Sequence, residues 1–175
     1  MAIKDALLPE FDQEMANTRK FLERIPDDKF KYKPHEKSTD LGGLASHIAM
    51  MPDWGADTMT KDNFDYAPVG GPAYQMPVLS TQKQLLEAFD KNVAKARAAL
   101  AAGDDAAFMK PWSLLAGGKV IFTMPRVAVI RSMILNHIIH HRGQLSVYLR
   151  LNNVPVPGPY GPSADEMPPG GGQPG

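Results

Sequence analysis

The sequence predicts an all-α protein in which four helices form a bundle, with a long crossover between the second and third helices and a small hairpin before the fourth. Four segments carry apolar residues at intervals of three or four positions, which is the spacing of an amphipathic helix. Stretches rich in proline and glycine separate these segments, and the longest covers residues 61–79. Long helices joined by one extended crossover are typical of a helical bundle.

The first two helices are joined by a polar connection. The first helix is expected from about Lys4 to Arg24, and Pro26 marks its end. The second is expected to begin at residues 38–40, because their side-chain oxygens can accept hydrogen bonds from the free N–H groups at a helix start. Pro52 is expected to kink or to end this helix.

The third helix is expected to open at Ser80 or Thr81 and to end at Gly103, since glycine is favoured at helix C-termini. The pattern of residues 108–123 predicts a small hairpin around a Gly-Gly pair, with a helix as the weaker alternative.

The fourth helix is expected from near Pro125 to about Leu151, which completes a bundle domain over residues 1–153. Residues 154–175 are expected to form a C-terminal tail. Their proline and glycine content rules out a helix or a central strand, and the last part is expected to be flexible.

The composition limits the possible functions. A chain of 175 residues with 43% hydrophobic residues suits one folded domain. The formal net charge is zero, whereas nucleic-acid binders usually carry a basic excess, so no nucleic-acid partner is expected. No apolar run is long enough to cross a membrane and the N-terminus lacks the plan of a signal peptide, so we expect a cytoplasmic protein without a membrane partner. Because cysteine is absent, any tight transition-metal site must use histidine and carboxylate.

Two histidines of the fourth helix form the first part of a candidate metal site. His137 and His141 are four residues apart, so at about 100° per residue their side chains stand one above the other and can bind one ion. The same angles place Gln144 and Tyr148 on this stripe, where they could position a substrate or a water molecule beside the ligands. His140 falls at the margin of the stripe, as a flanking residue or as the partner of a ligand.

His47 is the third candidate ligand. It lies within a pattern of apolar residues that starts at Leu44 and marks a buried face of the second helix. A buried imidazole needs partners for its nitrogens, and an ion shared with His137 and His141 would supply them. Three neutral imidazoles leave a coordination position for water or substrate, as in catalytic rather than structural zinc sites. Imidazole also suits nickel, copper and iron, so the ligand type does not identify the metal.

Two alternatives to an open metal site stay in view. A carboxylate of Asp57, Asp62 or Asp65 could close the coordination of the ion and give a non-catalytic protein. In a metal-free bundle, side chains and backbone would satisfy the histidines instead. Trp54 either lines a pocket or packs in the core.

Leu135 and Ile139 fall on the side of the fourth helix that faces away from the histidine stripe. Apolar residues on an outer helix face often mark an interface. This placement predicts a homodimer that uses the back of the fourth helix.

Three stretches carry a resemblance to a known family: TDLGGLASHIAMMPDW, NHIIHHRGQLSVYLR and NNVPVPGPYGPSADE. Along nearly its whole length the chain resembles the DinB-like family of metal-binding four-helix bundles. The run His-x-x-x-His-Arg-Gly-Gln is the most specific element. The resemblance implies one divalent metal ion, commonly zinc or nickel, on His47, His137 and His141, and it implies frequent dimers.

The resemblance implies several activities rather than one. Some members are thiol S-transferases that use a bacterial low-molecular-weight thiol, and others resemble metal-dependent isomerases or hydrolases. We therefore expect a metal-dependent enzyme whose ion activates water or a low-molecular-weight thiol against a small electrophilic substrate. The alternative is a non-catalytic bundle that binds a metal or a small ligand. No catalytic residue is predicted beyond the metal site.

Overall fold

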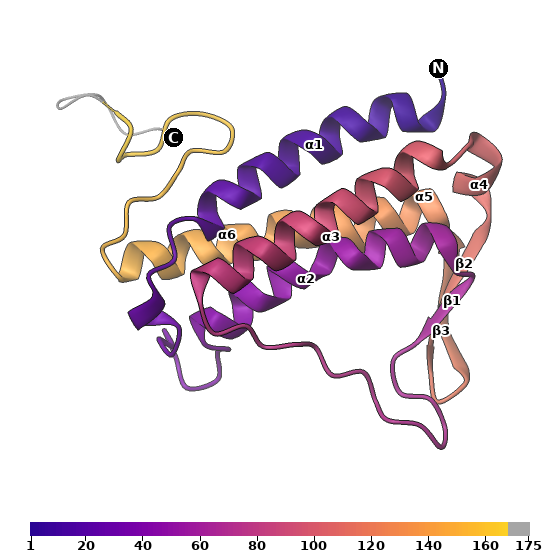
Figure 1. Ribbon diagram of the computed structural model, residues 1–175, viewed down its shortest axis with the longest axis horizontal. Coiled ribbons are helices and arrows are strands. Elements are labelled where there is room, and N and C mark those ends of the chain that lie inside the picture. The colour runs from indigo at the N-terminus through magenta and orange to yellow at the C-terminus, as the bar shows by residue number, and fades with distance from the viewer. Residues whose placement is uncertain (168–175) are drawn as a thin grey trace.

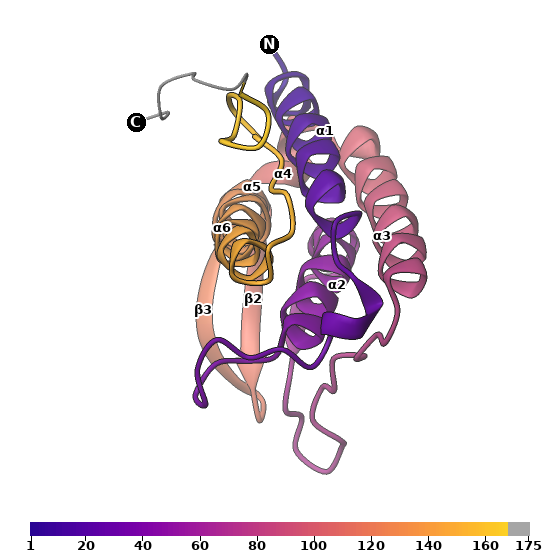
Figure 2. The same cartoon turned by 90° about the vertical axis from the view of Figure 1, so that its left-hand side faces the viewer.

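The computed structural model describes residues 1–167 as a mainly helical protein with a small sheet at one end (Figure 1). Long helical segments pack side by side with their axes roughly aligned (Figure 2). They are α1 (Ile3–Leu22), α2 (Leu41–Thr60), α3 (Gln82–Ala102) and one continuous run made of α5 (Arg126–Val129), the π-helical segment η2 (Ile130–Leu135) and α6 (Asn136–Leu151). Shorter elements are the 3-10 turn η1 (Asp27–Lys29), α4 (Asp105–Met109), β1 (Asn63–Asp65), β2 (Pro111–Ala116) and β3 (Lys119–Pro125). The predicted helical class is confirmed, and among residues 1–167 no helix is long and apolar enough to span a membrane.

The ends of the central helices follow local sequence signals. The Asp40 carboxylate accepts a hydrogen bond at 2.8 Å from the N–H three residues ahead, which caps the start of α2. Thr81 caps α3 in the same way, at 3.2 Å. Gly103 ends α3 as predicted. Pro52 lies inside α2 and does not end it.

The hairpin predicted before the last helix is present as β2 and β3. Its turn residues, Gly117 and Gly118, have φ values of 61° and 73°, and two-residue hairpin turns favour such positive values. β1 pairs in parallel with β2, which the sequence did not predict. Asp65 at the end of β1 accepts hydrogen bonds from the N–H groups of both glycines, at 3.1 and 2.7 Å, and so ties β1 to the turn.

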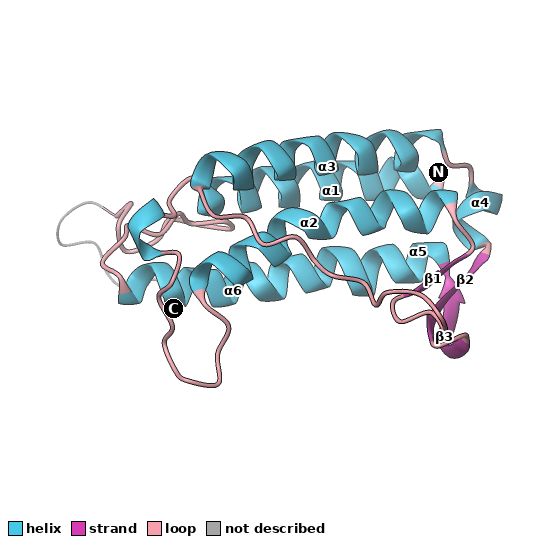
Figure 3. Cartoon of the chain, turned by 60° about the horizontal axis from the view of Figure 1, so that its bottom comes forward, coloured by secondary structure: helices cyan, strands magenta, loops and turns pink. Residues whose placement is uncertain are grey.

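The predicted long crossover connects β1 to α3. It leaves the sheet and runs back along the outside of α2 (Figure 3). The Leu79 N–H donates to the Ser46 hydroxyl at 2.9 Å, which fastens the end of the crossover to α2. This path places the crossover over the face of α2 that carries His47.

The buried face of α6 differs from the expected one. Ile138, Leu145 and Leu149 are fully buried, and α6 packs against both α1 and α2. The histidine stripe of the sequence analysis assumes an α-helix throughout, whereas the wider turn of η2 shifts the preceding apolar residues relative to α6. His141 therefore lies at the edge of the buried face and is half-buried.

The expectation that Leu135 faces outward is wrong. Leu135 has 0% of its surface exposed, and it lies on the same side of the helix as the buried Ile138 and Arg142. Ile139 is half-buried and borders a hollow under the C-terminal tail. The homodimer stays a prediction, and Leu135 no longer supports it.

The C-terminal tail folds back onto α1 and α6 over its described part, residues 154–167. The Tyr160 hydroxyl donates to the Glu14 carboxylate at 2.9 Å and accepts from the Arg142 guanidinium at 2.6 Å. Arg142 and Glu14 are themselves buried and form an ion pair at 2.8 Å. The predicted flexible end of the tail, residues 168–175, lies outside the described residues.

Candidate metal centre

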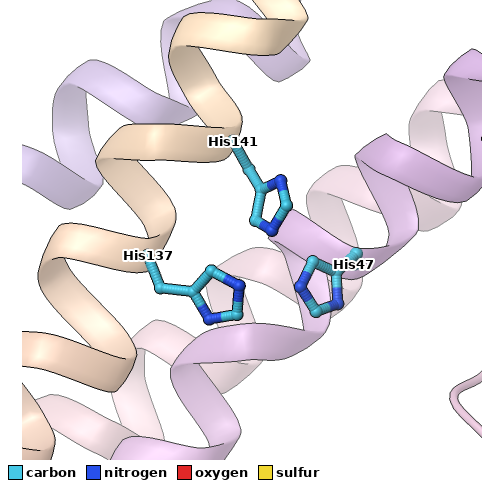
Figure 4. Close-up of side chains that lie close together, drawn as sticks. All are labelled: His47, His137 and His141. Atoms are coloured by element: carbon cyan, nitrogen blue, oxygen red, sulfur yellow. The ribbon is translucent and has the colours of Figure 1, made fainter. Parts of the chain in front are cut away.

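Three histidines from two helices converge at the edge of the helical core (Figure 4). α2 contributes His47, and α6 contributes His137 and His141; we call these residues the histidine triad. One ligand nitrogen of each lies within 4.8 Å of the other two, and the ring centroids are 4.6 to 5.2 Å apart. Tetrahedral zinc at about 2.0–2.1 Å from each nitrogen places such ligand atoms roughly 3.4 Å apart. The rings would thus need to close by no more than about 1.4 Å to share an ion.

Burial keeps the three rings neutral. Burial is the main cause that lowers the pKa of His47, and the nearby rings of His141 and His137 lower it further, to about 4. The pKa values of His137 and His141 are also lowered, mainly by burial. At neutral pH each ring therefore keeps a nitrogen lone pair, which a divalent ion requires.

Hydrogen bonds orient the two rings of α6. The His141 Nδ1–H donates to the Gln144 amide oxygen at 2.7 Å, and the His137 Nδ1–H donates to the Met133 carbonyl oxygen at 3.3 Å. Because a carbonyl oxygen can only accept, both protons are on Nδ1 and both Nε2 atoms keep their lone pairs. Partners of this kind hold metal-binding histidines in position.

The other predicted site residues surround the triad in different ways. Trp54 is half-buried, with its ring centroid 6.0 Å from that of His47. The His140 ring is exposed and lies 5.0 Å from the His141 ring, outside the group that could share an ion. Tyr148 is buried, and its hydroxyl donates at 3.1 Å to a backbone carbonyl just before α2, so it joins the two helices beside the site.

None of the three candidate carboxylates joins the triad. Asp57 pairs with two lysines, at 2.7 and 3.7 Å, and Asp62 pairs with Arg126 at 2.9 Å. Asp65 is engaged by the turn glycines of the hairpin. Within residues 1–167 the triad is the only group of histidine, cysteine or acidic residues arranged to hold an ion. The described part of the chain therefore offers three candidate ligands and not four.

A cavity of about 470 Å³ lies beside the triad, and His47 and His137 form part of its lining. Its wall is mostly apolar and comes from α2, the crossover, the hairpin and the start of the last helix. The aromatic members of the wall are Trp54, Phe64, Tyr66, Tyr74, Trp112 and Phe122.

A second, more polar groove of about 510 Å³ reaches the triad through His47 and His141. Gln144 and Tyr148 line it together with hydroxyl-bearing residues just before α2. Met76 of the crossover borders both the cavity and the groove, and its sulfur lies 3.2 Å from Nδ1 of His47. The triad is therefore accessible from two spaces of different polarity.

Sequence reasoning missed the crossover residues of this site. The Tyr74 ring packs 6.1 Å from Trp54 and 5.5 Å from Phe64, and Met76 touches His47. The crossover has no hydrophobic period, and these contacts join residues far apart in the chain. No local pattern could have identified them.

Comparison with known proteins places this arrangement in a family. A family model described as the DinB family matches residues 1–171. The chain belongs to the DinB family. A solved DinB-like protein from Bacillus cereus ATCC 10987 is 23% identical, with a TM-score of 0.69 over 90% of this chain and 97% of its own. A DinB-like protein from Bacillus subtilis is 20% identical, with a TM-score of 0.64 over 86% and 96% of the two chains. These identities support a shared DinB fold alone, and no curated protein matches significantly.

The metal-free DinB protein is expected to lose stability as the pH falls from 6.5 toward about 4. In the unfolded chain His47 takes up a proton near its ordinary pKa of 6.5, whereas the folded protein resists protonation until about pH 4. Between these two pH values protonation therefore favours the unfolded state. The stability that neutral His47 contributes to the fold is fully present above pH 6.5. Urea unfolding across these pH values measures the effect. His47→Gln should show a weaker pH dependence, and an unchanged one would contradict this account.

Replacing Gln144 by alanine is expected to weaken metal binding by this DinB protein about 10- to 100-fold, the usual effect of removing a partner of a ligand. The His141 ring would lose the acceptor that fixes its orientation. Competition with a chromophoric chelator measures the affinity. Val147→Ala, at an exposed position of the same helix, is the matched control. Equal affinities of the two variants would show that Gln144 does not hold the ligand.

Proposed function

We propose that this protein is a metal-dependent enzyme. A divalent ion, zinc or nickel, would be held by His47, His137 and His141. It would activate water or a low-molecular-weight thiol against a small electrophilic substrate. The observation that carries the proposal is the convergence of three neutral imidazoles at a point that both an apolar cavity and a polar groove reach.

The fit of these residues to a metal rests on their chemistry. Burial makes protonation of the rings costly, and the hydrogen bonds on His137 and His141 direct their free nitrogens away from the helix backbone. Three nitrogen ligands suit a four-coordinate ion that keeps one position for a reactant. When bound, such an ion supplies a lowered pKa for coordinated water or thiol and polarises a carbonyl group.

The two spaces beside the triad would bind the two reactants separately. The groove beside Gln144 and Tyr148 would admit the polar nucleophile, and the cavity beside His137 would hold the electrophile away from water. The sulfur or oxygen of the nucleophile would bond to the electrophilic atom of the substrate, and the group displaced from that atom would leave with the electrons of the broken bond. The proton of the water or thiol would pass to solvent through the polar groove. Asp57 lines the cavity, but its two lysine partners make it a poor general base.

The second candidate function is a non-catalytic protein that binds a metal or a small ligand. A closed site of this kind needs a fourth protein ligand, and among residues 1–167 no carboxylate lies with the triad. The geometry therefore favours the enzyme. A cytoplasmic location and a homodimer remain predictions of the sequence.

The test compares the protein loaded with one equivalent of zinc or nickel with the His137→Ala/His141→Ala variant and with free metal. A panel of thiol-transfer and ester- or amide-hydrolysis substrates is followed with each sample. We expect turnover by the loaded protein and none above free metal by the double variant. Full metal occupancy without turnover on any substrate would overturn the enzyme and leave the non-catalytic alternative.

A further inference from the structure

We propose that the cavity beside the triad binds an uncharged molecule that contains an aromatic or similar flat ring, and that this is the electrophilic substrate. The assignment of the cavity as a binding site stands on its lining. Its role as a substrate site rests on the function proposed above. The proposal selects neutral ring compounds over charged compounds of the same size.

The wall favours flat, apolar groups. Aromatic side chains reach it from α2, β1, the crossover, β2 and β3, and the Trp54–Tyr74 and Phe64–Tyr74 pairs meet edge to face. Such rings offer both faces and edges to another ring, which adds to the gain from burying apolar surface. A volume of about 470 Å³ lies within the usual range for small-molecule sites and accommodates one or two rings.

The charges around the cavity disfavour ions. No lysine or arginine is among its lining residues, so an anion finds no partner on the protein there. The lining carboxylate, Asp57, is already paired with Lys61 and Lys95, so it has little attraction left for a cation. Moving a charge from water into such a wall without a partner is costly.

Two further polar groups of the wall, on Thr58 and Trp112, are not available to a ligand. The Thr58 hydroxyl is used internally, since it donates to the Trp54 carbonyl at 2.7 Å. The Trp112 indole nitrogen is enclosed in the interior, without an acceptor among residues 1–167, so this ring presents carbon to the cavity. Apart from the polar atoms of the two lining tyrosines and two lining histidines, recognition therefore depends on shape and apolar contact.

The cavity is open to solvent at one end and reaches the triad at the other. Tyr66 and Tyr74 belong to its wall and expose 43% and 38% of their surfaces, so the cavity meets solvent at the crossover. His47 and His137 belong to the same wall and lie at the edge of the helical core. A molecule that enters past the two tyrosines can bring its reactive end to the triad while its ring stays in the aromatic part.

The experiment uses three 4-substituted nitrobenzenes of similar size: neutral 4-nitrotoluene, anionic 4-nitrobenzoate and cationic 4-nitrobenzylammonium. The chain has two tryptophans, and both lie in the cavity wall, so quenching of their fluorescence reports binding there. We expect 4-nitrotoluene to bind about tenfold tighter than either ion, because the ions lose hydration without gaining a partner. Titrations use the full chain both without metal and with one equivalent of zinc.

Phe122→Ala and Ile121→Ala form a matched pair on β3. Phe122 lines the cavity, whereas Ile121 is 56% exposed and does not. Phe122→Ala should weaken 4-nitrotoluene binding about tenfold through lost ring contact, and Ile121→Ala should leave it unchanged. Tighter binding of either ion to the metal-free chain, no saturable quenching, or equal effects of the two variants would overturn the proposal. Selective binding without turnover in the substrate panel would overturn the enzyme and not the cavity assignment.

Discussion

Replacing His137 and His141 together by alanine is expected to abolish tight metal binding. His47, the candidate ligand that remains, cannot hold an ion tightly alone, because among the described residues only His137 and His141 are arranged with it to share one. The metal affinity should fall by more than about 100-fold, which is the upper limit for removing a residue that only supports a ligand. Metal content after dialysis against equimolar zinc, and affinity by chelator competition, measure the effect.

His140→Ala is the matched control for the histidine variants. It removes the same side chain from the neighbouring position, but His140 is exposed and lies outside the triad. Its metal content should equal that of the wild type. Excess zinc should also raise the melting temperature of wild type and His140→Ala, since a ligand that binds only the folded state stabilises it. Equal metal content in wild type and double variant would remove the basis of the metal site.

Replacing Arg142 by alanine is expected to lower the free energy of unfolding by about 3–5 kcal/mol, because it leaves the buried Glu14 carboxylate without its partner. The guanidinium pairs with Glu14 at 2.8 Å and also donates to the Glu14 carbonyl and the Thr18 hydroxyl, each at 3.2 Å. The Tyr160 contact that fastens the tail would be lost as well. Urea unfolding at pH 7 measures the change.

Two controls identify the cause of that loss. Arg142→Met/Glu14→Leu removes both charges and fills the space, so it should recover most of the stability. Arg97→Ala breaks an exposed ion pair with Asp12 and should leave the stability close to that of the wild type. A loss below about 1 kcal/mol for Arg142→Ala would show that the buried pair does not hold the tail and helices together.

Local signals in the sequence were sufficient for most of the helical framework. Asp40 and Thr81 cap the starts of α2 and α3, and Gly103 caps the end of α3, through hydrogen bonds to residues a few positions away. Their effect can therefore be predicted from neighbours in the chain. The same holds for the glycine turn of the hairpin. β1 was not predicted because three residues are too few to show an alternating pattern. Its parallel partner, β2, also lies about fifty positions further along the chain.

The candidate site was predictable only in part. The four-residue spacing of His137 and His141 fixes their common direction, and the structure brings His47 beside them. The buried face of α6 was not predictable, because η2 breaks the regular angle on which the assignment of Leu135 depends. The aromatic wall was not predictable either, since it is assembled from the crossover and hairpin by tertiary contacts alone.

The wide turn of η2 has a consequence for how this site can change over time. The cavity wall includes Val129, Met133 and Ile134, which lie before and within the turn, whereas the two histidines of the triad on α6 follow it. A π turn holds one residue more than an α turn. Loss of one codon inside η2 would therefore favour a regular α-helix in which the wall residues and the two histidines keep nearly the same relative direction. In evolutionary terms the extra residue behaves as a tolerated insertion, which the gene can gain or lose without separating the cavity from the histidines.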